Sequence, residues 1–198
     1  MQRTCLAASG HLARSGRQPA ALAVVKRIAI IGSGGAGKSV FARELGQRTG
    51  LPVIHLDRLY WRPGWTEPPK DEWRQVHDGL IAGESWIIDG NYGGTMEPRL
   101  GAADTVVFLD LPRLVCLWSV VRRRFSEGRR GRADMADGLQ DKLEWAFLSW
   151  IWNYPATRRP GILTLLASLP PETDVVRLRS RRAAREWLAG VTPGAAAA

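Results

Sequence analysis

Short apolar runs alternate with longer segments of helical periodicity along most of this chain. The runs that predict strands are Arg27 to Ile31, Pro52 to Leu56, Trp86 to Ile88, Thr105 to Leu109 and Val175 to Leu178. Strand-sized runs separated by helical segments are typical of α/β units around a parallel sheet. The pattern therefore predicts an α/β domain with helices between the strands.

Segments between these runs have the periodicity of amphipathic helices. Lys38 to Gly50 carries Val40, Phe41 and Leu45 on one stripe and ends at a glycine that suits a C-cap. A second helix follows Pro112, and a third runs from about Ala136 to Tyr154. Their apolar faces are expected at Leu114, Leu117, Trp118 and Val121, and at Leu139, Leu143, Phe147, Trp150 and Tyr154. Helical spacing also favours core packing for Trp118, Trp145, Trp150 and Trp187.

The regular pattern begins abruptly at Lys26 and fades after Gly190. Residues 1–25 contain arginines but no acid, and they lack sustained periodicity, so we interpret them as a disordered tail or as sequence that precedes the true start of translation. Residues 191–198 are Ala-rich and predicted to be a second tail. Between them, residues 26–190 are expected to form one domain with a single core.

The composition is that of an ordinary globular protein, with 45 % hydrophobic and 24 % charged residues in a chain of 198. No stretch approaches the roughly 18 apolar residues of a membrane helix. Cys5 and Cys116 are too few for a disulfide framework and have no metal-type spacing with the histidines. We expect a soluble protein of the reducing cytoplasm.

The net charge of +9 is concentrated in two arginine clusters. Arg122 to Arg132 contains six arginines and one glutamate, and Arg177 to Arg185 contains five arginines and no acid. Such clusters are typical of proteins that bind phosphate groups, either of a nucleic acid or of a smaller ligand. Motifs elsewhere in the chain are needed to distinguish between these two kinds of partner.

Residues Gly32 to Ser39 fit the phosphate-binding pattern G-x-x-x-x-G-K-[ST]. An apolar strand precedes the motif and an amphipathic helix follows it, which is the context that the mechanism requires. Lys38 is predicted to act in catalysis at the β and γ phosphates, and the Ser39 hydroxyl to bind Mg²⁺. The residues predicted to bind ATP are Gly32, Ser33, Gly34, Gly35, Ala36, Gly37, Lys38, Ser39 and Val40.

Three aspartates, Asp57, Asp89 and Asp110, each follow an apolar run. The carboxyl ends of strands in an open parallel sheet face the ligand, so these carboxylates can approach the phosphate loop. Asp89 is predicted to lie near Mg²⁺. Asp57 is predicted either to accept the proton of an acceptor hydroxyl or to bind the substrate or a Mg²⁺-bound water. For Asp110, which precedes Leu111-Pro112, capping of a turn or helix is favoured.

Together, these segments resemble a known family. Gly32 to Ser39, His55 to Trp61, Trp86 to Tyr92 and Phe108 to Pro112 look like the adenylate-kinase-like P-loop proteins of the DNA topology modulation (FlaR-related) family. The likeness extends over about residues 26–188. It implies a three-layer P-loop fold, with a five-stranded parallel sheet of order 2-3-1-4-5, helices on both faces and an Arg-rich lid. Asp57-Arg-Leu-Tyr60 is also similar to the segment of uridine-type kinases in which an aspartate is the base.

Within the wider group of kinases, Asp89-Gly90 matches the start of the Asp-Gly-Phe-Pro-Arg stretch of nucleoside-monophosphate kinases. Here Asn91 and Tyr92 follow, and the next arginine is Arg99. This departure weakens the case for a nucleoside monophosphate as the phosphate acceptor.

The first arginine cluster occupies the position of the lid in the resembled kinases. Mobile arginines there stabilise the charge of a phosphoryl-transfer transition state, and we take Arg123 and Arg132 as the candidates. A solvated basic loop is the alternative. Arg179 and Ser180 occupy the place where related kinases hold adenine, so Arg179 is predicted to bind the nucleotide. Arg181, Arg182 and Arg185 are expected to face solvent.

The segment Arg58 to Glu84 occupies the acceptor-binding position of the resembled fold and contains Trp61, Trp65 and Trp73. Aromatic side chains here would stack on a base or sugar, or pack on one another. The favoured function is ATP-dependent phosphoryl transfer to a small molecule. The alternatives are a DNA-binding protein switched by a nucleotide, and an NTPase that uses only water.

Overall fold

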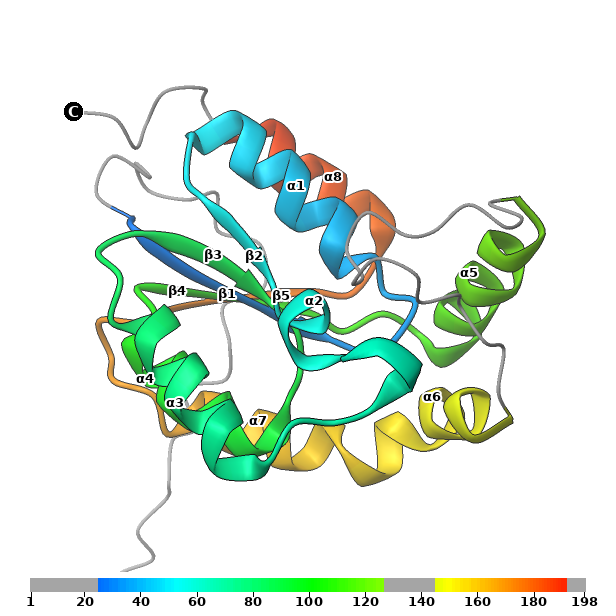
Figure 1. Ribbon diagram of the computed structural model, residues 1–198. Coiled ribbons are helices and arrows are strands. Elements are labelled where there is room, and N and C mark those ends of the chain that lie inside the picture. The colour runs from blue at the N-terminus through cyan, green and yellow to red at the C-terminus, as the bar shows by residue number, and fades with distance from the viewer. Residues whose placement is uncertain (1–24, 127–144, 192–198) are drawn as a thin grey trace, which may run out of the picture.

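The computed structural model describes residues 25–126 and 145–191, and within them it contains a parallel five-stranded sheet. The strands lie in the order β2-β3-β1-β4-β5, which confirms the order implied by the resemblance (Figure 1). Their bounds are β1 Arg27–Gly32, β2 Val53–His55, β3 Trp86–Asp89, β4 Thr105–Leu109 and β5 Asp174–Leu178. All five lie within the predicted runs or extend them by one residue.

The central strand β1 has a hydrophobic core on each side. Ile28 and Ile30 belong to one cluster of buried side chains, while Ala29 and Ile31 belong to the other. Successive side chains of a strand point to opposite faces, so a strand covered on both faces must be apolar at every position. This explains why β1 appears in the sequence as a continuous apolar run.

Helices cover both faces of the sheet (Figure 1). On one face lie α1 (Lys38–Thr49) and α8 (Arg181–Ala189), and on the other lie α3 (Lys70–Ile81), α4 (Met96–Ala102) and α7 (Arg159–Ala167). The remaining elements are α2 (Leu56–Tyr60), η2 (Pro63–Trp65), η3 (Gly93–Thr95), α5 (Arg113–Ser126) and α6 (Trp145–Thr157). The three-layer α/β architecture predicted from the sequence is confirmed.

One predicted helix end, at Gly50, can be compared directly with the structure. Gly50 has φ 77° and donates its N–H to the Gly46 carbonyl at 2.8 Å, as expected for a glycine C-cap. The predicted helix from Ala136 is described from Trp145 onwards, so Leu139 and Leu143 lie outside the described residues, as do residues 1–24 and 192–198 of the predicted tails. No described helix is both long and apolar enough to cross a membrane.

The predicted face of α5 is correct only in part, since Leu117 packs against the core while two other members of the face do not. Leu114 and Trp118 are 66 % and 65 % exposed, whereas Cys116 and Val120 are buried in the core. The helix packs against the phosphate loop and α6. The face that contacts these partners is not the most apolar stripe of the helix. The same error affects Val40, which is 60 % exposed on α1 beside buried Phe41.

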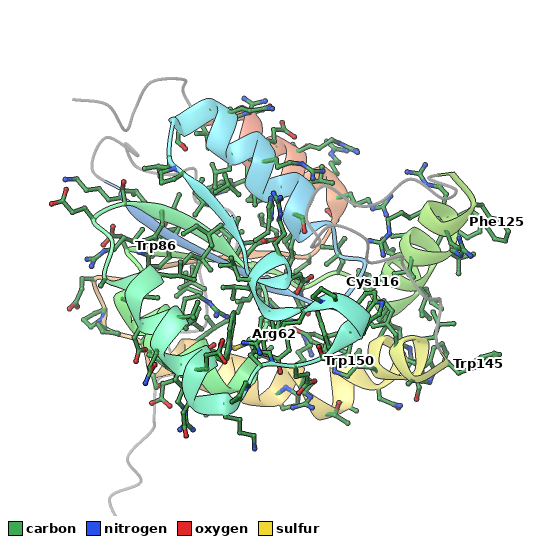
Figure 2. The ribbon with its side chains drawn as sticks, viewed as in Figure 1. Arg62, Trp86, Cys116, Phe125, Trp145 and Trp150 are labelled. Atoms are coloured by element: carbon green, nitrogen blue, oxygen red, sulfur yellow. The ribbon has the colours of Figure 1, made fainter. Side chains whose placement is uncertain are left out.

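Core packing is confirmed for Trp187 and contradicted for Trp118 and Trp145. Trp187 is buried and stacks on Phe41, with ring centroids 5.6 Å apart. Trp150 is half-buried, whereas Trp145 is 86 % exposed and points away from the body of the protein together with Phe125 (Figure 2). Helical spacing identified a stripe on each helix, but only the tertiary contacts determine which stripe is covered.

Candidate functional site

The phosphate loop connects the end of β1 to the first turn of α1. Gly35 has φ 75°, and a Cβ atom there would lie 2.2 Å from the Cys116 carbonyl oxygen. Only glycine can adopt this backbone conformation and also leave room for the close approach of α5. The first turn of α1 contains no acidic residue, so its unpaired N–H groups and its dipole form an anion-binding position.

Lys38 begins α1, and its side chain folds back over the loop. Its Nζ donates a hydrogen bond to the Ser33 carbonyl oxygen at 3.1 Å. Ser39 follows in the first helical turn and is half-buried. The structure thus places the ammonium and the hydroxyl at the positive end of the helix, which is the arrangement that polyphosphate binding requires.

Asp89 is the last residue of β3, and this strand lies between β1 and β2. Its register neighbours are Ile30 on β1 and His55 on β2. The Asp89 side chain is almost fully buried and accepts a hydrogen bond of 2.7 Å from His55 Nδ1. A buried carboxylate beside the phosphate loop fits a role near a divalent cation. The sequence pattern identified Asp89, but it did not indicate His55 as its partner.

Asn91 connects the loop after β3 to the start of the phosphate loop. Its Oδ1 accepts a hydrogen bond from the Gly32 N–H at 3.1 Å, and its Nδ2 donates to the Gly32 carbonyl at 2.7 Å. The side-chain amide therefore fixes both backbone groups of Gly32. The sequence pattern did not indicate this role of Asn91.

Arg99 is completely buried behind the same loop. It donates hydrogen bonds to the carbonyl oxygens of Gly90 at 2.9 Å and Asn91 at 3.0 Å. Burial lowers its pKa to about 10, so it remains charged at neutral pH, with the Asp89 charge opposing the effect of burial. Arg99 therefore supports the loop from inside and is not exposed to an acceptor.

His77 on α3 is the remaining partner of this arginine. Its Nε2 lies 3.3 Å from Arg99 Nη1. Arginine only donates, so Nε2 accepts and the ring proton is on Nδ1. Burial, followed by the nearby Arg99 charge, lowers the His77 pKa to about 4. The imidazole is therefore neutral at physiological pH.

Asp57 lies in the first turn of α2, just after the end of β2. The hydroxyl of Tyr92 donates a hydrogen bond to its Oδ1 at 2.6 Å. Since β2 is the neighbour of β3, Asp57, which follows β2, and Asp89, which ends β3, lie at the same edge of the sheet. The structure brings the two predicted carboxylates to that edge, together with a tyrosine that sequence analysis missed.

Aromatic side chains pack beside Asp57. The ring centroid of Tyr60 lies 4.9 Å from that of Trp73 and 4.4 Å from that of Tyr92. Trp61 and Trp65 are half-buried, and their rings meet at 5.4 Å in an edge-on contact. In this structure the aromatic residues after Asp57 contact one another, which is one of the two arrangements that the sequence left open.

Asp110 has a different role from the predicted cap. Its carboxylate accepts hydrogen bonds from Arg159 Nε at 2.9 Å and from Arg177 Nε at 2.8 Å. It is an ion-pair centre that joins the end of β4 to β5 and α7, and this function depends on residues that are distant in the sequence.

The predicted arginines fall into different settings. Arg123 is half-buried on α5, Arg179 is exposed after β5, and Arg132 lies outside the described residues. Ser180 caps α8 by accepting a hydrogen bond from the Ala183 N–H at 3.1 Å. Arg181, Arg182 and Arg185 are exposed as predicted.

Comparison with solved structures identifies the fold. A shikimate kinase from Acinetobacter baumannii in complex with shikimate matches with a TM-score of 0.51 and 15 % identity, over 85 % of this chain and 92 % of that one. The chain has a P-loop kinase fold. A shikimate kinase from Bacteroides thetaiotaomicron matches with a TM-score of 0.51 and 15 % identity, over 83 % and 95 %.

A gluconokinase from Sinorhizobium meliloti 1021 matches this P-loop kinase fold more distantly, with a TM-score of 0.45 and 18 % identity over 84 % of this chain and 91 % of that one. No family model and no curated protein matches the sequence. The likeness is therefore one of fold.

Proposed function

We propose that this protein transfers the γ-phosphoryl group of ATP to a hydroxyl group of a small molecule. The observation that carries the proposal is the convergence of a complete phosphate loop, Asp89 and Asp57 at one edge of three neighbouring strands. The likeness in fold to two proteins named shikimate kinase supports it. Neither observation identifies the acceptor.

The polyphosphate would bind at the N-terminus of α1, where backbone N–H groups and Lys38 provide positive charge. Arg179, with Arg123 and Arg132 of the predicted lid, would add to this charge. A bound Mg²⁺ would supply positive charge that neutralises the polyphosphate. The Ser39 hydroxyl and the buried Asp89 carboxylate are hard oxygen donors that fit this ion. No group of three or more metal-binding side chains is present among the described residues.

Asp57 would act as the base. In this step the acceptor oxygen bonds to the γ phosphorus, and its proton passes to the Asp57 carboxylate. The bond between that phosphorus and the bridging oxygen breaks, and ADP leaves with the electron pair. A carboxylate that contacts the acceptor without taking its proton is the alternative for Asp57, and it predicts a weaker effect of substitution on kcat.

Arg99 narrows the class of acceptor. In the nucleoside-monophosphate kinases whose Asp-Gly-Phe-Pro-Arg stretch Asp89-Gly90 resembles, the arginine stands three residues after the glycine, whereas the next arginine in this chain is Arg99 on α4. Here Arg99 is fully buried and donates to two carbonyl oxygens of the loop. We therefore expect nucleosides or polyols rather than nucleoside monophosphates as acceptors.

A screen of nucleosides, nucleotides and small polyols for acceptor-dependent ADP release tests this proposal. Transfer requires release that rises with one class of acceptor and falls on the order of 100-fold in Asp57→Asn if Asp57 is the base. Release that is independent of every acceptor would instead support an NTPase.

Nucleic-acid binding is the second candidate, and the first arginine cluster favours it. Arg122 and Arg124 are exposed on α5, next to Phe125, which is 83 % exposed. Basic and aromatic side chains together suit a nucleic acid, and this function would fit the resemblance to DNA topology modulation proteins. It predicts binding of duplex DNA that weakens steeply with salt, and absence of binding at low salt would contradict it.

A further inference from the structure

Tyr92 contacts the proposed base directly. Its hydroxyl donates to Oδ1 of Asp57 at 2.6 Å. Within residues 25–126 and 145–191, no side chain donates a hydrogen bond to Oδ2. The two oxygens of this carboxylate are therefore distinct, since Oδ1 accepts from Tyr92 and Oδ2 accepts from no described side chain.

The backbone of Tyr92 has an uncommon conformation, with φ 26° and ψ 79°. Positive φ is strained for a residue with a bulky side chain and persists only where neighbouring contacts hold it. Arg99 donates to the carbonyl of Asn91, and the Thr95 N–H donates to that of Tyr92 at 3.0 Å. The fold thus keeps Tyr92 in a strained conformation at the residue that touches Asp57.

The ring is fixed by packing against its neighbours. Tyr60 lies 4.4 Å away and Trp73 lies 5.3 Å away, measured between ring centroids. Burial, followed by the charge of Asp57, raises the pKa of the Tyr92 hydroxyl far above its ordinary value. The other ionisable groups that act on Tyr92 are Tyr60 on α2, Asp89 on β3 and Arg99 on α4. The phenol is therefore a neutral hydrogen-bond donor across the physiological pH range.

We propose that Tyr92 is a positioning residue for Asp57, holding Oδ1 so that Oδ2 faces the acceptor hydroxyl. The inference rests on the proposed function for its catalytic consequence, but the contact itself has consequences that can be measured without a substrate. Loss of the hydroxyl removes the hydrogen bond to Oδ1 and so changes the electronic environment of the carboxylate. Loss of the hydroxyl also frees the carboxylate to rotate.

The test compares Tyr92→Phe with Tyr154→Phe in the full-length chain. Both variants keep the ring and remove one phenol oxygen. Tyr154 is a matched control because it is buried on α6 and its hydroxyl has no hydrogen-bond partner among the described residues. The readouts are the carbon-13 chemical shift of the Asp57 carboxyl at neutral pH, assigned with Asp57→Asn, and kcat and KM with an acceptor from the screen.

In Tyr92→Phe we expect the carbon-13 resonance of the Asp57 carboxyl at neutral pH to shift, because its hydrogen bond to the phenol is lost. We expect kcat to fall at least about tenfold with the KM for ATP unchanged. Tyr154→Phe should change neither quantity. An unchanged resonance in Tyr92→Phe, or an equal change in both variants, overturns the proposal.

The two proposals fail in different ways. A shifted Asp57 resonance in Tyr92→Phe with no acceptor-dependent activity in the wild-type protein supports the contact and contradicts the proposed function. Transfer that falls in Asp57→Asn but not in Tyr92→Phe supports the proposed function and contradicts the role of Tyr92.

Discussion

At the scale of single residues, Asn91 determines where the phosphate loop begins, because its amide hydrogen-bonds both backbone groups of Gly32. Asn91→Ala removes both bonds. A net loss of about 1–2 kcal/mol should weaken ATP binding by about 5- to 30-fold, as measured by titration calorimetry. Asn153→Ala, an exposed position on α6, is the control and should bind ATP like the wild type. Equal affinity in all three proteins would contradict the role of Asn91.

His77 predicts a pH dependence of stability. Its pKa is about 4 in the folded protein and near 6.5 in the unfolded chain. Between these values the unfolded chain binds more protons, so the free energy of unfolding falls as the pH drops from about 6.5 to 4. The His77 contribution to this loss is at most about 3 kcal/mol.

Urea denaturation of the wild type and His77→Gln between pH 7 and pH 4 measures this effect. Glutamine can still accept from Arg99 but does not titrate, so the wild-type protein should lose more stability than the variant over this range. If the free energy of unfolding falls equally with pH in the two proteins, His77 does not bind a proton on unfolding.

Single residues also show what the sequence could not reveal about the site. Asp57 and Asp89 were predictable because each ends an apolar run, and strand ends converge in a parallel sheet. The supporting residues His55, Asn91, Tyr92 and Arg99 act through hydrogen bonds whose geometry exists only after the strands have paired. Arg99 is the clearest example, because nothing in the sequence indicates that this charged residue is completely buried.

At the scale of elements, the contact between α5 and the phosphate loop depends on Gly35. Gly35→Ala places a Cβ 2.2 Å from the Cys116 carbonyl and strains a backbone with φ 75°. We expect a loss of stability of about 1–3 kcal/mol and impaired ATP binding. Gly101→Ala on α4 is the control, because its Cβ meets no atom within 4 Å, and alanine favours a helix. A Gly35→Ala variant as stable as Gly101→Ala would contradict the contact.

Asp110 joins β4, β5 and α7 through Arg159 and Arg177. Its side chain is 8 % exposed and that of Arg177 is 13 % exposed, so Asp110→Asn leaves a buried positive charge without its counter-ion. We expect a loss of about 2–4 kcal/mol in the free energy of unfolding, measured by urea denaturation. Glu44→Gln removes the more exposed ion pair with Arg48 and should have little effect. Similar values for both variants would contradict a buried ion-pair centre.

Strands were predicted more accurately than helix faces. A strand buried on both sides has a continuous apolar run, so its position can be identified without knowledge of its partners. On α5, in contrast, several stripes are apolar, and the buried one contains Cys116 and Val120 because it faces the phosphate loop. Which stripe is buried depends on tertiary contacts that the helical period does not encode.

At the scale of the whole molecule, the arginines that produce the net charge of +9 have several roles. Arg177 belongs to the second predicted cluster, yet it pairs with Asp110. Arg99 supports the loop after β3, and Arg182 pairs with Glu186 on α8. Part of the positive charge therefore stabilises the fold. Arg179, at the carboxyl end of β5, is exposed and remains a candidate for nucleotide binding.

The central claim is phosphoryl transfer that depends on the phosphate loop. The most direct measurement is acceptor-dependent ADP release by the wild-type protein and by Lys38→Ala, with folding of the variant checked by circular dichroism. We predict that the wild type releases ADP in proportion to phosphorylated acceptor, and that Lys38→Ala is folded but slower on the order of 100-fold. Undiminished release by the folded variant would contradict the account.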